Sequence, residues 1–150
     1  MRFDEPAAGD RQAWAVPRGH GTWQGMDLES LDPGDDDELG FLLQALHGRG
    51  DLPASGPGPG SPDHAGNPRL HLMMHQIVAR QILDDNPPQT WQAVQRLAGL
   101  GYRWHDIMHM IAGLVSDDVH RALTGQAHPD SADYARRLDE LPAGWPEPQP

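Results

Sequence analysis

Apolar residues follow a helical spacing through most of the chain after Asn67 and through little of it before. This spacing and the positions of proline and glycine predict four helices, over residues 68–84, 87–99, 103–123 and 131–141. The second of them comes directly after the break at Asn86-Pro87-Pro88, where we expect Asn86 to cap the helix and Pro87 to occupy its first position. Because short connections favour antiparallel neighbours, the predicted fold class is all-α, a small antiparallel helical bundle.

The first half of the chain gives a different pattern. Residues 35–38 are all acidic and favour a helix N-terminus, and four leucines follow at helical spacing, so one short helix is expected there. No usable period precedes this helix, and glycine and proline dominate the segment after it. We therefore expect a long, acidic, Gly/Pro-rich and partly disordered N-terminal region. The predicted organisation is an irregular N-terminal arm (residues 1–34), a short helix with a Gly/Pro-rich loop (35–66), a helical histidine-containing domain (67–141) and an extended tail (142–150).

Two pairs of histidines stand four residues apart within two of the predicted helices. His71 and His75 form the first pair, and His105 and His109 form the second. Positions four apart on a helix lie about 40° around the axis and roughly 6 Å along it, so each pair can direct two imidazoles toward one point. Since both pairs border apolar stripes, the two helices could together supply four nitrogens to one metal ion.

Composition limits the ligand chemistry to histidine and carboxylate, because the chain has no cysteine. Four neutral imidazoles suit a divalent transition metal such as zinc, iron or copper. Asp106 is turned about 100° away from His105, so we expect it to orient a ligand rather than to bind the ion. His120 lies too far along its helix to share a metal with His109. His47 is the one further histidine near enough to a docked helix to be a candidate ligand.

The charge excludes some partners. A formal charge of −11, with all 11 basic residues being arginine and only Arg136 and Arg137 adjacent, argues against a nucleic-acid-binding surface. No segment approaches the length of a membrane span, and the acidic start does not fit a signal peptide. We therefore expect a cytoplasmic protein that binds neither nucleic acid nor membrane. A homodimer that shares metals between protomers, or a protein partner, stays open.

The three runs NPRLHLMMHQIVARQ, NPPQTWQAVQRLAGLGY and HDIMHMIAGLVSDDVHRAL make this chain similar to a group of uncharacterised proteins. It resembles the bacterial domain-of-unknown-function family eighteen-forty-one from about Asn67 to Leu123, and more loosely to Trp145. Members of that family carry paired His-x-x-x-His helices, which match the four histidines named above. They also tend to carry His-Pro where this chain reads His47-Gly48, which weakens any role for His47. The resemblance implies a helical fold in a bacterial protein and no activity.

Three functions are compatible with these residues. The first is a helical domain in which His71, His75, His105 and His109 bind a divalent transition metal, with a sensory, storage or structural role. The second is a metal-free protein-interaction module whose histidines are hydrogen-bonded core groups. The third is a metal-dependent hydrolase of the HD type, built on His71 and His105-Asp106. A zinc peptidase fits less well, because Leu72 and Asp106 stand where the glutamate of an HExxH motif would follow the first histidine.

Overall fold

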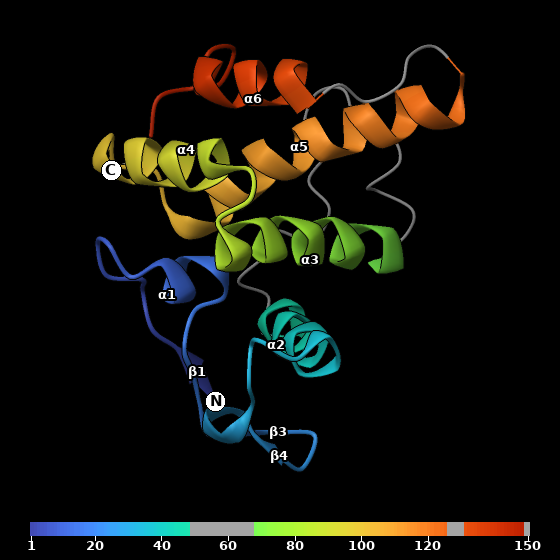
Figure 1. Ribbon diagram of the computed structural model, residues 1–150. Helices are drawn as coiled ribbons and strands as arrows, with labels where there is room; N and C mark the ends of the chain where they lie inside the picture. The colour runs from blue at the N-terminus through green and yellow to red at the C-terminus, as the bar shows by residue number, and fades with distance from the viewer. Residues whose placement is uncertain (49–67, 126–130, 149–150) are drawn as a thin grey trace.

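The computed structural model describes residues 1–48, 68–125 and 131–148, apart from the side chains of residues 47, 48 and 68, and it is mostly helical (Figure 1). The helices predicted for the second half are confirmed, with ends that differ from the expected ones by one residue at most. The helices are α1 (Arg11–Ala15), α2 (Asp36–Gly48), α3 (Pro68–Asp84), α4 (Pro88–Gly99), α5 (Trp104–Leu123) and α6 (Ser131–Glu140). The loop expected up to residue 66 lies outside the described residues from position 49 onward.

The starts of α2 and α4 show how local chemistry sets the helix ends. The carboxylate of Asp35 accepts hydrogen bonds from the backbone N–H groups of Asp37 and Glu38, at 2.9 and 3.1 Å, so the acidic run does begin a helix. The predicted cap at Asn86 is wrong. Pro87 is the N-cap of α4 and makes no side-chain cap bond, while the N–H of Asn86 donates to the carbonyl of Gln81 and so completes the end of α3.

The turn between α4 and α5 depends on a glycine. Gly101 has a φ of 101°, a left-handed conformation that favours residues without a Cβ. Its N–H donates to the carbonyl of Ala98, and the next N–H, of Tyr102, donates to the carbonyl of Leu97. These bonds satisfy carbonyls in the last turn of α4 and direct the chain into α5.

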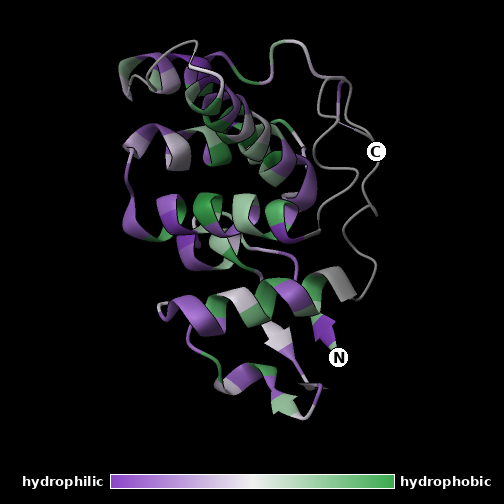
Figure 2. Cartoon of the chain, turned by 90° about the vertical axis from the view of Figure 1, so that its right-hand side faces the viewer, coloured by the Kyte–Doolittle hydropathy of each residue, from purple (hydrophilic) through white to green (hydrophobic). Residues whose placement is uncertain are grey.

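Helix α3 lies at the centre of the arrangement, in contact with α1, α2, α4 and α5, while α6 packs on α4 and α5 (Figure 1). Apolar and polar bands alternate along the helices (Figure 2), as expected for helices that each bury one side. The largest fully buried side chains come from α2 to α6 and include Leu39, Leu43, Val78, Ile82, Val94, Leu97, Ile107, Ile111 and Leu138. The antiparallel order of the bundle stays a prediction. Within the described ranges, none of the helices combines the length and the apolar character that crossing a membrane requires.

The first thirty residues form short elements that the sequence pattern does not reveal. The strands β1 (Arg2–Phe3) and β2 (Gly19–His20) pair antiparallel, as do β3 (Thr22–Trp23) and β4 (Met26–Asp27), and η1 (Leu28–Ser30) comes next along the chain. Strands of two residues are too short to show an alternating pattern. This region also contributes to the core, since Trp14 is 6% and Leu28 is 2% exposed.

Several polar contacts join the N-terminal region to the second half of the chain, among them the ion pair of Arg11 with Asp85 at 3.4 Å, the bond from Arg80 to the carbonyl of Gly34 at 2.6 Å, and one buried hydrogen bond. The indole N–H of Trp104, the first residue of α5, donates to the backbone carbonyl of Trp14 at 2.9 Å, and the bond is buried. This bond links α1 to α5 across 90 positions of sequence and orients the Trp104 ring, while α1 packs mainly on α3.

Candidate metal centre

Three histidines meet between α3 and α5. One nitrogen from each of His71, His75 and His109 lies within 4.8 Å of the other two. The Nε2 atoms of His71 and His75 are 3.1 Å apart, and the ring of His109 lies 5.5 Å, centroid to centroid, from each of the other rings. The structure thus brings together three of the four histidines that the sequence singles out.

The two helices position these rings by different means. His71 and His75 are one turn apart on α3, so their side chains project from the same side of that helix. His109 reaches them from α5, which packs directly on α3. His75 is 1% exposed, and the indole of Trp104 stacks on it at 6.2 Å with an angle of 23° between the ring planes. The bond from Trp104 to α1 therefore also holds one wall of the histidine cluster.

His105 does not belong to this group. Its Nε2 atom lies 3.1 Å from the Oδ1 atom of the adjacent Asp106, and both side chains are partly exposed, at 33% and 41%. Asp106 therefore lies against His105, while its role as an orienting partner of a metal ligand stays a prediction.

Of the remaining histidines, the two whose side chains the structure describes, His20 and His120, lie apart from the cluster. His120 is exposed toward the end of α5, consistent with its distance from His109 along the helix. His20 lies in the N-terminal region between the carboxylates of Asp4 and Glu29, at 2.7 and 2.9 Å. The side chain of His47, and the whole of residues 64 and 128, lie outside the described part of the chain.

A small cavity of about 150 Å³ lies beside His109. Tyr102 and Asp106 form one part of its wall, and Trp145 and Glu147 from the C-terminal tail form another. The Tyr102 hydroxyl donates to the backbone carbonyl of Pro146 at 2.8 Å and holds the tail in place. The cavity therefore opens next to His109, under the tail.

The geometry of the cluster is compatible with two chemical states. In a tetrahedral site with Zn–N bonds of about 2.05 Å, ligand nitrogens are about 3.3 Å apart, close to the separation of the two Nε2 atoms in the structure. Without a metal, one of the two rings can donate its Nε2–H to the other, which accepts as a neutral imidazole. The Nε2 atoms of His71 and His75 can therefore take part in an ion site or form one hydrogen bond between the two rings.

Two residues that shape this site, Trp104 and Tyr102, were not identified from the sequence. Trp104 stacks on His75, but this contact forms only because α5 packs on α3, so the position of Trp104 in the sequence does not reveal it. The Tyr102 hydroxyl holds the tail over the cavity beside His109. Tyr102 lies in the turn after α4, where no periodic pattern marks it.

Comparison with known proteins adds a family and no chemistry. A family model described as "Domain of unknown function (DUF1841)" matches residues 61–140. No curated protein and no solved structure matches the chain. The matched range includes α3 to α6, and hence all three histidines of the cluster.

Proposed function

Since the chain belongs to the DUF1841 family of domains of unknown function, a membership that assigns no activity, we propose its function from the histidine cluster. We propose that His71, His75 and His109 bind one divalent transition metal ion, such as zinc, iron or copper. The role is sensory, storage or structural rather than hydrolytic.

The convergence of three imidazole nitrogens from two helices, within 4.8 Å of one another, is the observation that carries this proposal. Imidazole is a good ligand for zinc, copper and iron. One ligand of the site is sheltered, since His75 is buried and Trp104 stacks on it, while His71 and His109 are half-buried. Three protein ligands leave at least one coordination position for water or another donor.

A non-hydrolytic role is supported by the surroundings of the cluster. The cavity beside His109 measures only about 150 Å³ and lies under the tail, which leaves room for a small ligand but little for a large substrate. The HD-type hydrolase receives less support. Its His-Asp dyad would be His105-Asp106, which pair with each other, while His105 is not part of the three-histidine group.

The metal-free interaction module is the second candidate, and the contact between His71 and His75 favours it. At 3.1 Å their Nε2 atoms are within hydrogen-bonding distance, so these two nitrogens can be satisfied without an ion. In this alternative the cluster stabilises the contact of α3 with α5, and the acidic surface of the chain meets a protein partner, in line with the net charge of −11.

Metal titration of the full chain, purified without a histidine tag and stripped with a chelator, separates the two candidates. Cobalt(II) serves as a spectroscopic probe of imidazole coordination, and zinc is then titrated in competition. We expect one ion per chain. The matched pair of variants is His109→Ala and His105→Ala, which remove the same side chain from the same helix one turn apart.

Under the proposal, His109→Ala lowers the affinity more than about 100-fold and His105→Ala changes it less than about threefold. Equal losses in the two variants would instead support the four-histidine site expected from the sequence. If the unmodified chain takes up no stoichiometric metal and zinc leaves its unfolding temperature unchanged, the metal-binding function is wrong and the interaction module is favoured.

A further inference from the structure

A second cavity lies on the opposite end of α5 from the histidine cluster, where α3, α5 and α6 meet. Its volume is about 340 Å³, within the range of roughly 300–1,000 Å³ that is common for sites that bind small molecules. Apolar side chains of α5, among them Val115, Val119 and Leu123, form one wall. Gln81 of α3, Asp118 of α5 and Tyr134 of α6 supply polar groups to the lining.

The hydrogen bonds of Gln81 fix its side-chain amide. Its Oε1 atom accepts from the hydroxyl of Tyr134 at 2.8 Å and from the hydroxyl of Thr90 at 2.9 Å. Both donors are buried, at 8% and 0% exposure. Because the carbonyl oxygen already has two partners, the Nε2–H groups are what Gln81 has to offer a ligand.

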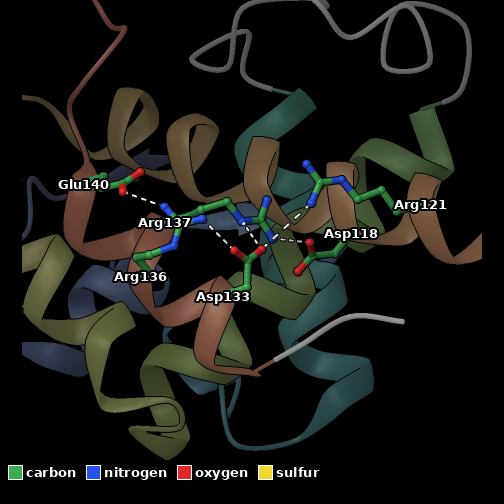
Figure 3. Close-up of polar contacts among 6 residues, drawn as sticks. All are labelled: Asp118, Arg121, Asp133, Arg136, Arg137 and Glu140. Atoms are coloured by element: carbon green, nitrogen blue, oxygen red, sulfur yellow. Dashed lines mark hydrogen bonds and ion pairs between the residues drawn. The ribbon is translucent and has the colours of Figure 1, made fainter. Parts of the chain in front are cut away.

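A network of ion pairs holds the α6 wall of this cavity in place (Figure 3). Arg137 of α6 pairs with Asp118 of α5, and these two side chains are only 12% and 16% exposed. Arg137 also pairs with Asp133 at 3.1 Å, and Asp133 in turn lies 3.9 Å from Arg121 of α5. These contacts join α5 to α6 on both sides of Arg137, so the cavity is already formed without a ligand.

The polar groups of the lining define the head group of a ligand. Gln81 offers a donor, and the Asp118 carboxylate is an acceptor whose charge Arg137 balances. A carboxylate head has no N–H to donate to the Asp118 carboxylate, so two acceptors would face each other. A primary carboxamide satisfies both groups, since its carbonyl accepts from Gln81 and its N–H donates to Asp118.

We propose that this cavity is a binding site for a small neutral primary amide with an apolar body. The body packs on Val115 and Val119, and the amide lies between Gln81 and Asp118. The site is separate from the histidine cluster and does not depend on a metal.

Titration of the isotope-labelled full chain with hexanamide, followed by NMR, tests the site. Hexanamide has an apolar chain and a primary amide, and hexanoate is the matched probe with a charged head. The blocking variant is Ala122→Trp, because Ala122 lines the cavity and is exposed, so the indole can fill the space without disturbing the core. Gln95→Trp adds the same side chain to an exposed position of α4 and is the control.

We expect hexanamide to bind with a Kd on the order of 1 mM, to shift the side-chain amide signals of Gln81, and to bind at least about tenfold tighter than hexanoate. Ala122→Trp should weaken this binding at least about tenfold, while Gln95→Trp leaves it unchanged. Equal affinity for the two probes would overturn the assignment of the head group. No saturable shift, or binding that survives Ala122→Trp, would overturn the site itself.

Discussion

Replacing Trp104 by phenylalanine tests the bond that attaches the N-terminal region to the helical core. The change removes the indole N–H that donates to the carbonyl of Trp14, in a position that is 7% exposed, and keeps an aromatic face toward His75. Leaving that buried carbonyl without its donor costs about 1–3 kcal/mol. The smaller ring adds about 1 kcal/mol for lost packing. The expected loss is therefore about 2–4 kcal/mol in the free energy of unfolding, or about 5–15 °C in Tm for a chain of this size.

Trp91→Phe is the matched control, since Trp91 lies half-buried on α4 and loses the same part of its ring. It should cost about 1 kcal/mol, the packing contribution alone. Urea unfolding gives both values, and amide hydrogen exchange locates the effect. In Trp104→Phe, exchange should accelerate in α1, which spans Arg11–Ala15, more than in α4. Equal losses in the two variants, with exchange in α1 unchanged, would refute the idea that this bond holds the N-terminal region in place.

Three further predictions concern titration and the ion pairs of α6. Burial raises the pKa of Tyr134 from 10.0 to about 12, so the folded chain keeps this proton longer than the unfolded chain does. Stability should then fall by up to about 3 kcal/mol between pH 10 and 12, and Tyr134→Phe should flatten that part of the urea-unfolding profile. The ring of His20 donates hydrogen bonds to two carboxylates, first Asp4 and then Glu29, and these bonds raise the pKa of His20 above 6.5. The stabilisation of β1 by these hydrogen bonds should therefore be complete below pH 6.5 and be lost as the pH rises through the pKa of His20 in the folded state. The loss should appear as faster amide exchange in β1. His20→Gln should show this faster exchange at every pH. Asp118→Asn should lower the free energy of unfolding by about 1–3 kcal/mol, because the largely buried guanidinium of Arg137 then faces a neutral amide instead of a carboxylate. A double-mutant cycle with Arg137→Gln that finds no coupling would contradict this.

The helices could be predicted because their apolar residues repeat with the helical period. On α5, Ile107, Ile111 and Val115 recur at intervals of four and are 0–7% exposed, so the period identifies the buried side directly. The start of α4 could not be fixed in this way. Asn86 could either cap the next helix or complete the previous one, and the choice depends on which N–H groups bond to the last carbonyls of α3. In the structure the N–H of Asn86 donates to the carbonyl of Gln81.

The N-terminal elements escaped prediction for another physical reason. Trp14 and Leu28 are buried by contacts with segments far away in sequence, and no local period marks them. The strands that frame them pair over two residues each, with Arg2 opposite His20 and Thr22 opposite Asp27. Long-range contacts, such as the hydrogen bond from Trp104 and the ion pair of Arg11 with Asp85, leave no trace in the spacing of neighbouring residues.

The candidate site shows how far helical spacing can determine a ligand set. A four-residue interval places two rings on one side of a helix, which is sufficient to bring His71 and His75 together because both belong to α3. For both rings of a second helix to reach the same ion, both must lie level with the first pair along the helix axis. His105 and His109 are roughly 6 Å apart in that direction. With ligand nitrogens required to lie within a few ångströms of one ion, the helix contact selects the ring that lies opposite α3.

On α5 that ring is His109, and His105 instead contacts its neighbour Asp106. Two crossing helices with paired histidines thus supply three nitrogens more readily than four. A three-nitrogen centre has a coordination position that the protein does not fill with histidine, and here the cavity beside His109 adjoins the cluster. Under the proposed function, an ion bound in this way can exchange a small ligand without leaving its helices, which is the property that a sensory site requires and a closed structural site lacks.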